Sequence, residues 1–361
     1  MAYVMLAGSL PEDLDEQPYQ FRRVLVTHVR ANIQHSILVK KEITDRYFDD
    51  AHEKFGRLLS EQGYDSEAEK FQIQVLDMGN RFIGKKHPDT TTAMNDLAIS
   101  YEILGKYADA EKLKIQVLDM RNSLLGEDHP DTICTMGSLA VTYSSLGKHA
   151  DAEKLEIHVF NMRNRLLGED HPDTITAMYN LAISYENLGK YANAEKLKIQ
   201  VLDMRNRLLG EDPDTIWTMG SLAVTYSSLG KHADAEKLEI QVLKMRSRLF
   251  GKDNPDIITA MGNLAITYEN LGKYTDAEKL KIQVLDMRNR LLGEDHPYTI
   301  NAMENLAKTY HHLKKLKDAE KLEIQILDIR KRILGQGHLD TTKRVTLLTE
   351  IRSQTNTNTE S

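Results

Sequence analysis

An internal repeat of about 42 residues constrains the fold of this chain more than any other feature. The repeat is marked by a proline that recurs at Pro88, Pro130, Pro172, Pro213, Pro255 and Pro297, with Leu339 at the next corresponding position. The successive spacings are 42, 42, 41, 42, 42 and 42 residues. Because one such unit cannot bury its apolar face alone, the copies are expected to stack on one another in a linear array.

Each copy has the pattern of a helical hairpin, as residues 88–129 illustrate. Apolar residues at steps of three and four predict a first helix with the apolar face Met94, Leu97, Ala98, Tyr101 and Leu104. The same steps predict a second, longer helix with the apolar face Ala110, Leu113, Val117, Leu118, Met120, Leu124 and Leu125. Gly105 separates the two runs, and Gly126 follows the second, where a helix C-cap favours a residue without a Cβ.

The chain is therefore predicted to be an all-α solenoid of helical hairpins. The expected order is a divergent N-terminal segment at 1–45, a divergent first copy at 46–87, six copies at 88–338, a capping helix at 339–352 and a disordered polar tail at 353–361. Within the first segment, residues 19–41 have the spacing of an amphipathic helix that would cover the first copy.

Composition excludes several classes of partner and setting. The chain has 47 basic and 54 acidic side chains and a formal charge of −7, which gives no electrostatic basis for binding nucleic acid. Cys134 is the single cysteine, so the chain cannot form an intramolecular disulfide. No apolar run approaches the roughly 20 residues of a membrane-spanning helix. We therefore expect a cytoplasmic protein that does not bind membranes.

The repeat resembles a known motif. The residues Asn180-Leu181-Ala182, Tyr185, Gly189-Lys190-Tyr191 and Ala194-Glu195, preceded by His171-Pro172-Asp173, resemble a tetratricopeptide repeat, and in length they are similar to the kinesin light chain type. The resemblance implies a right-handed superhelix whose first helices line a concave groove. It also implies a non-catalytic scaffold or adaptor that binds a peptide or a helix of another protein in that groove.

Two observations leave the biological setting open. Kinesin light chains bind the kinesin heavy chain through a coiled coil that precedes the repeats, but residues 1–45 contain no sustained heptads. Kinesin heavy chain therefore stays a candidate partner, although residues 1–45 lack the coiled coil through which kinesin light chains bind it. The near-identical copies are similar to the arrays of fungal NB-ARC (NOD-like receptor) proteins, and the segment at 19–30 resembles the junction between the NTPase region and the array in such proteins. This resemblance implies an alternative function as a ligand-sensing or regulatory array. The chain has no phosphate-binding loop of its own.

We expect no catalytic residues, no cofactor and no metal ligands. The motif Glu127-Asp128-His129-Pro130-Asp131 brings carboxylates and an imidazole together, but it recurs at nearly every predicted helix start, where such residues cap helices. A column of methionines has the spacing of the packing face and is expected in the core rather than at a binding surface: Met94, Met136, Met178, Met219, Met261 and Met303. An active site would break the repeat symmetry, and no residue set does so.

The candidate binding residues belong to the first helices and lie outside the packing set. They are Asn95, Glu102, Ser138, Tyr179, Asn180, Glu186, Trp217, Ser221, Asn263, Glu269, Glu304, Asn305 and Lys308. The residue after the repeated Ala is aliphatic in five copies and Lys308 in the sixth. With so few cations the groove would be a poor carboxylate clamp, whereas the glutamates recurring in every second copy suit a protein partner with basic and apolar anchors. Trp217 is either a binding hot spot or a variable position.

A second alternating column lies on the predicted second helices. Its members are Lys114, Glu156, Lys198, Glu239, Lys281 and Glu323. One hypothesis is a ladder of opposite charges between neighbouring second helices. The alternative is a solvated face, on which ion pairs contribute only about 0–1 kcal/mol.

Overall fold

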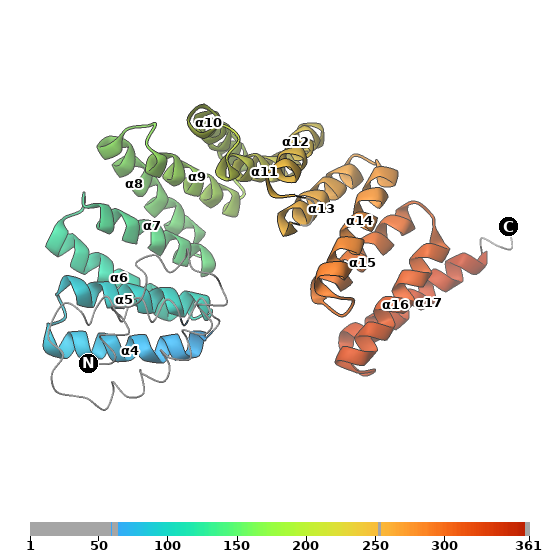
Figure 1. Ribbon diagram of the computed structural model, residues 1–361, viewed down its shortest axis with the longest axis horizontal. Coiled ribbons are helices and arrows are strands. Elements are labelled where there is room, and N and C mark those ends of the chain that lie inside the picture. The colour runs from blue at the N-terminus through green and yellow to red at the C-terminus, as the bar shows by residue number, and fades with distance from the viewer. Residues whose placement is uncertain (1–58, 60–63, 252–253, 358–361) are drawn as a thin grey trace. The chain divides into compact units, whose positions relative to one another are not determined.

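The computed structural model describes residues 59, 64–251 and 254–357, and the regular elements among them are all helices (Figure 1). This confirms the predicted all-α class. The predicted amphipathic helix at 19–41 and the first part of the divergent copy lie outside the described residues. Two compact units divide the chain after Gly189, and each is described by itself below.

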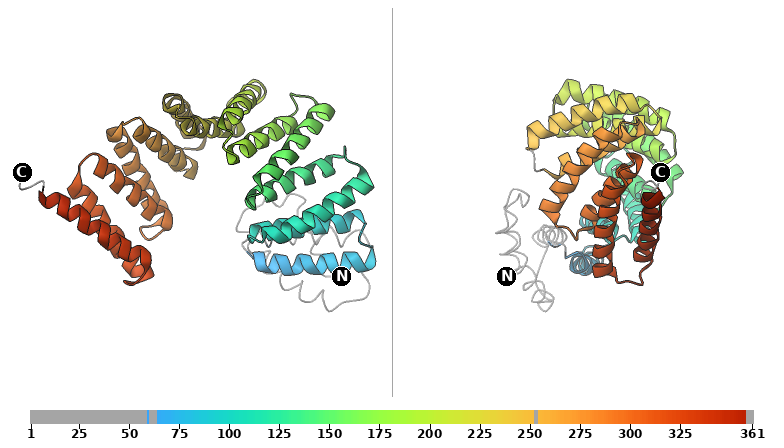
Figure 2. Two further views of the ribbon diagram at one scale, coloured as in Figure 1. Left: turned by 180° about the vertical axis from the view of Figure 1, so that it is seen from behind. Right: turned by 90° about the vertical axis from the view of Figure 1, so that its right-hand side faces the viewer.

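The first unit contains the second helix of the divergent copy, two complete hairpins and one further first helix. Its elements are α4 (Asp65–Phe82), α5 (Pro88–Ile103), α6 (Tyr107–Leu125), α7 (Pro130–Ser145), α8 (His149–Leu167) and α9 (Pro172–Asn187). From α4 to α9, helices that follow one another in the chain pack together, as the opposite views of Figures 1 and 2 also show. The prolines begin the first helices at the positions that the repeat predicts.

The second unit continues the same pattern. Its elements are α10 (Tyr191–Leu209), α11 (Pro213–Ser228), α12 (His232–Phe250), α13 (Pro255–Asn270), α14 (Tyr274–Leu292), α15 (Pro297–His312), α16 (Leu316–Leu334) and α17 (Leu339–Thr357). Consecutive helices again pack together. Helix α17 continues five residues past the predicted end at 352, so residues 353–357 are helical and the prediction of a disordered tail from residue 353 is wrong for them.

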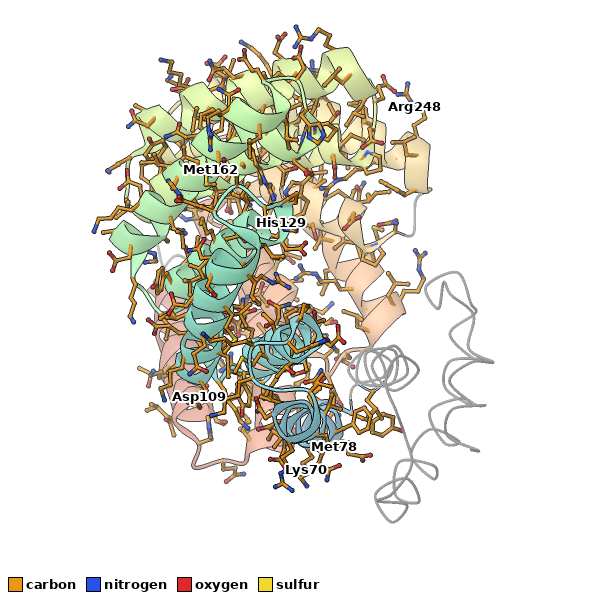
Figure 3. The ribbon with its side chains drawn as sticks, turned by 90° about the vertical axis from the view of Figure 1, so that its left-hand side faces the viewer. Lys70, Met78, Asp109, His129, Met162 and Arg248 are labelled. Atoms are coloured by element: carbon orange, nitrogen blue, oxygen red, sulfur yellow. The ribbon has the colours of Figure 1, made fainter. Side chains whose placement is uncertain are left out.

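The junction motif caps the first helices, as predicted. In α7, Nδ1 of His129 accepts a hydrogen bond of 3.2 Å from the backbone N–H of Asp131; His129 is labelled in Figure 3. At the shortened junction Asp212 Oδ1 accepts the equivalent bond at 2.9 Å, and Asn254 Oδ1 accepts it at 2.7 Å before α13. A cap of this kind satisfies one of the N–H groups that a helix start leaves unpaired.

The turn within a hairpin places one residue in the left-handed region; this residue is glycine in the earlier hairpins and Lys314, with a φ of 56°, between α15 and α16. After α5, the N–H of Lys106 donates to the carbonyl of Tyr101 at 2.7 Å and the N–H of Gly105 to that of Glu102 at 3.0 Å. This Schellman pattern requires a positive φ, and Gly105 has a φ of 72°. The same turn recurs at Gly147, with a φ of 74°.

The core lies between first and second helices. In the first unit one buried cluster joins Ile133 and Met136 of α7, Val159 and Met162 of α8 and Ala177 of α9. Five methionines of the predicted column are buried, and Met261 is half-buried, which confirms that they belong to the core. Leu124 and Leu125 depart from prediction: they are 45% and 41% exposed. In this hairpin the first helix α5 has 16 residues and the second helix α6 has 19, and Leu124 and Leu125 lie in the last turn of the longer helix.

Candidate functional site

One face of each first helix is not used in packing between the helices. In the first unit Ile99 and Val141, one residue after the repeated Ala, are 42% and 53% exposed, and in the second unit Val224 and Ile266 are 49% and 52% exposed. Ile183 of α9 is half-buried, and Lys308 occupies the same place on α15. We call the five aliphatic residues at this position the aliphatic column. The column gives the first helices a recurring exposed apolar position, as leucines such as Leu208 and Leu249 do at the ends of the second helices.

Glycine lies one turn before three members of the column. Gly137, Gly220 and Gly262 stand four residues before Val141, Val224 and Ile266. A Cβ built at any of these glycines meets no other atom within 4 Å, so packing within the chain does not require glycine there. Glycine inside a helix costs about 1 kcal/mol relative to alanine. Its effect on this face is to leave bare backbone beside exposed aliphatic side chains, where another chain can approach closely.

The predicted binding residues all lie on first helices. They come from α5 (Asn95, Glu102), α7 (Ser138), α9 (Tyr179, Asn180, Glu186), α11 (Trp217, Ser221), α13 (Asn263, Glu269) and α15 (Glu304, Asn305, Lys308). Trp217 is 59% exposed and Lys308 is also exposed, whereas the others are half-buried. The structure therefore places amides, a tryptophan and a lysine on the same helices as the aliphatic column.

The glutamates of this set are not free charges. Nζ of Lys114 lies 2.6 Å from Oε1 of Glu102, which also accepts a hydrogen bond of 2.5 Å from the Thr142 hydroxyl. In the second unit Lys281 Nζ lies 2.6 Å from Glu269 Oε1. Both carboxylates are thus neutralised by a lysine of their own hairpin. This pairing removes the main argument for a partner with basic anchors at these two positions.

Glu304 is paired in a similar way at the C-terminal end. Nη2 of Arg330 in α16 lies 2.5 Å from Glu304 Oε1, and Nη2 of Arg344 in α17 lies 2.6 Å from the same oxygen. Lys308 is therefore the exposed charged residue among the candidates of α15, while Asn305 offers its amide on the same helix. The first-helix face of the second unit changes from apolar at α11 and α13 to polar and cationic at α15.

The alternating column of the second helices is buried, which contradicts both hypotheses from the sequence. Lys114 has no exposed surface, and Lys281 and Glu323 are also buried. Lys114 reaches across to α7, where the carbonyl of Ser138 accepts a hydrogen bond of 3.2 Å from Nζ. Burial lowers the pKa of the Lys114 and Lys281 ammonium groups, and the bonded glutamate opposes that shift. The alternating column therefore lies between neighbouring hairpins. It is not exposed to solvent, and it does not form a ladder of charges between second helices.

A signal for this pairing is present in the sequence. Copies with glutamate at the position of Glu102 have lysine twelve residues later, and copies with Ser144, Ser227 or His311 there have glutamate instead. The two positions change together between copies. Such joint variation indicates that the two positions are in contact. Neither the first-helix column nor the second-helix column shows this by itself.

No group of three or more His, Cys, Asp or Glu side chains within residues 64–251 and 254–357 is arranged to hold a metal ion. Cys134 is exposed, and Nη2 of Arg163 lies 3.7 Å from its Sγ. None of the helices in the described ranges is both long enough and apolar enough to cross a membrane.

Comparison with protein families agrees with the repeat. The tetratricopeptide repeat family model matches residues 49–123, 97–165, 173–248 and 256–332. Solved structures of similar fold include the nearly identical TPR-like repeats assigned to a kinesin light chain of Podosopora anserina, at 24% identity, covering 57% of this chain and 98% of that one with a TM-score of 0.53. No curated protein matches the chain.

Two further structures are similar in fold. BtubC of P. vanneervenii is 22% identical, with coverage of 65% of this chain and 92% of that one and a TM-score of 0.52. A signal transduction ATPase with numerous domains and a tetratricopeptide repeat sensor from Pyrococcus horikoshii is 15% identical, with coverage of 81% of this chain and 48% of that one and a TM-score of 0.56. Identities at this level establish a shared fold.

Proposed function

This chain belongs to the tetratricopeptide-repeat family, and we propose that it is a scaffold whose first helices bind an extended or helical segment of another protein. Arrays of this family generally mediate protein–protein interaction. The observation that carries the proposal is the aliphatic column, exposed at the same position in both units and bordered by glycine backbone. No enzymatic step forms part of this function.

The chemistry of the face defines the partner. The column provides apolar contacts, Asn180, Asn263 and Asn305 provide amides that both donate and accept hydrogen bonds, and Trp217 provides a large exposed ring. Because Glu102, Glu269 and Glu304 are already paired, apolar side chains and backbone groups of the partner carry the binding energy. Basic side chains of the partner contribute less to the binding energy than the glutamates suggested when only the sequence was considered.

Selection from a phage-displayed library of twelve-residue peptides tests this proposal without knowledge of the natural partner. The wild-type chain should enrich peptides with spaced apolar residues. The variant Val224→Glu/Ile266→Glu should bind those peptides at least tenfold more weakly, because a charge at each anchor must be desolvated. A matched control is Leu208→Glu/Leu249→Glu, which changes aliphatic side chains of similar exposure on α10 and α12.

The outcomes separate clearly. Loss of binding in the first variant and retention in the control support the proposed face. Equal loss in both variants, or no enrichment above background, contradicts it. Trp217→Ala decides between the two interpretations of the tryptophan, since a hot spot loses about 2 kcal/mol of binding energy or more and a variable position loses almost none.

An alternative function uses the same face as a sensor. The similarity of residues 19–30 to NB-ARC junctions favours a regulatory array that reports ligand binding to a separate signalling NTPase. Binding of a purified NB-ARC NTPase region to this chain, with loss on Val224→Glu/Ile266→Glu, would support the sensor. Binding of kinesin heavy chain under the same conditions would support the motor adaptor.

A further inference from the structure

Two buried carboxyls on the second helices form no ion pair within the described residues. Glu156 of α8 and Glu239 of α12 are 2% and 5% exposed. In each, the oxygen Oε2 is buried and accepts no hydrogen bond. They occupy the position of Lys114 and Lys281 in the neighbouring copies, where the ammonium group has a glutamate partner at 2.6 Å. The copies that contain Glu156 and Glu239 carry Ser144 and Ser227 in place of that partner.

In the last copy the glutamate at the equivalent position has a cationic partner. Glu323 of α16 is also buried, but Nη1 of Arg344 in α17 donates to both of its oxygens at 2.9 Å. The chain thus buries a paired lysine, an unpaired glutamate or an arginine-paired glutamate at one repeated position. A buried carboxylate without a partner favours its neutral, protonated form.

The charged and titratable groups near Glu156 and Glu239 balance these carboxylates less strongly than Arg344 balances Glu323. For Glu156, burial is the main influence and raises the pKa to about 7, against a smaller opposing effect of Arg163 on the same helix. That guanidinium donates to the carbonyl of Asp173 at 3.0 Å. For Glu239, burial again raises the pKa to about 7, opposed by a hydrogen bond from Thr267 of α13 and assisted by Glu236 of α12. Tyr268 of α13 also lies within electrostatic range of Glu239.

We propose that the junction between α8 and α9 and the junction between α12 and α13 are proton-sensitive joints, which tighten when Glu156 and Glu239 bind a proton and loosen when they release it. Each joint lies inside one unit: α8 packs against α9 in the first and α12 against α13 in the second. Helices α9 and α13 carry Asn180, Asn263 and Ile266 of the proposed binding face. Proton release therefore weakens the support beneath that face in alternate repeats.

The direction of the effect follows from linkage. The carboxyls hold a proton more tightly when the junction is closed than when it is open and hydrated, where their pKa is ordinary. Closure is therefore favoured fully at about pH 4.5 and below, loses its advantage as the pH rises toward 7, and levels off above that pH. The equilibrium constant for opening should rise by up to about tenfold per pH unit between pH 5 and pH 7 at each junction.

Hydrogen–deuterium exchange of the whole chain, corrected for the intrinsic pH dependence of exchange, measures this opening segment by segment. Peptides of α8–α9 and α12–α13 should lose protection between pH 5 and pH 7. Peptides of α6–α7 and α14–α15 are the internal control, because their junctions contain the Lys114–Glu102 and Lys281–Glu269 pairs. Their protection should stay constant over the same range.

Substitution identifies the responsible groups. Glu156→Gln/Glu239→Gln keeps the shape and removes the titration, so protection at both junctions should become independent of pH and exceed the wild-type value at pH 7.5. Glu323→Gln, the same change at a paired position, should instead reduce protection of α16–α17 at pH 7.5. Glu169→Gln, on an exposed residue, should change neither.

The proposal is overturned if wild-type α8–α9 and α12–α13 show the same pH profile as the internal controls. It is also overturned if the double glutamine variant keeps the wild-type pH dependence. A separate readout is the carboxyl carbon resonance of Glu239, assigned by its absence in Glu239→Gln, which should titrate near pH 7. An ordinary titration near pH 4.5 would show that the closed junction already accommodates the charge.

Discussion

Removing Lys114 tests whether the buried column holds adjacent hairpins together. Lys114 is fully buried, its Nζ is 2.6 Å from Glu102 Oε1, and it also donates to the carbonyl of Ser138 at 3.2 Å in the next hairpin. The variant Lys114→Met fills most of the same volume but leaves the Glu102 carboxylate and the Ser138 carbonyl without their donor. Loss of one partner of a buried ion pair costs about 3–5 kcal/mol.

The structure places the expected value near the lower end of that range. The Glu102 side chain keeps 21% exposure and its hydrogen bond from Thr142, both of which moderate the penalty of an unbalanced charge. We therefore expect a loss of about 3 kcal/mol in the free energy of unfolding. Urea denaturation at pH 7.5, followed by circular dichroism at the helix band, measures this difference.

Two further variants control the interpretation. Lys112→Met removes a lysine two residues away whose side chain is 72% exposed and which pairs with Asp109 at 3.0 Å, and it should cost less than about 1 kcal/mol. Lys114→Met/Glu102→Gln removes both charges and should recover most of the loss, because Thr142 can still donate to the amide oxygen. A Lys114→Met chain as stable as wild type would refute the argument that the pair is a buried structural contact.

Three smaller predictions use the same unfolding measurement. Gly137→Ala should stabilise by about 0.5–1 kcal/mol, since a Cβ meets open space on α7, and a loss of stability would contradict the surface described for this glycine. Gly147→Ala should destabilise by about 1 kcal/mol or more because its φ is 74°; an unchanged midpoint would count against the Schellman turn. Asp212→Ala should cost about 1 kcal/mol by removing the cap of α11, whereas Asp212→Asn, which keeps an acceptor oxygen, should restore most of it.

The hairpins were predictable because their causes are local. Apolar spacing, proline at a helix start and glycine at a turn act over a few residues, so the sequence of one copy contains them all. The methionine column and the capping role of His129 were predicted correctly for this reason. The alternation of charge on the second helices was also visible, but its meaning was not.

The buried charges depended on contacts between copies. Lys114 pairs with Glu102 of its own hairpin and donates a hydrogen bond to the carbonyl of Ser138 in the next hairpin. Both contacts depend on how the helices stack. The exposure of Leu124 and Leu125 has a similar origin, since their apolar spacing predicted burial and the stacking of the described helices leaves them 45% and 41% exposed.

The amino-acid sequence alone determined the repeat length, the helix starts, the turns and the face of each first helix that packs. The tertiary structure decided which glutamates of that helix are already neutralised and which carboxyls of the second helices are buried without an ion pair. The physical reason is that helix formation and capping depend on neighbours along the chain, whereas the energy of a charge depends on which atoms surround it in space. Identical side chains at one repeated position therefore differ in pairing, although their local sequences are nearly the same.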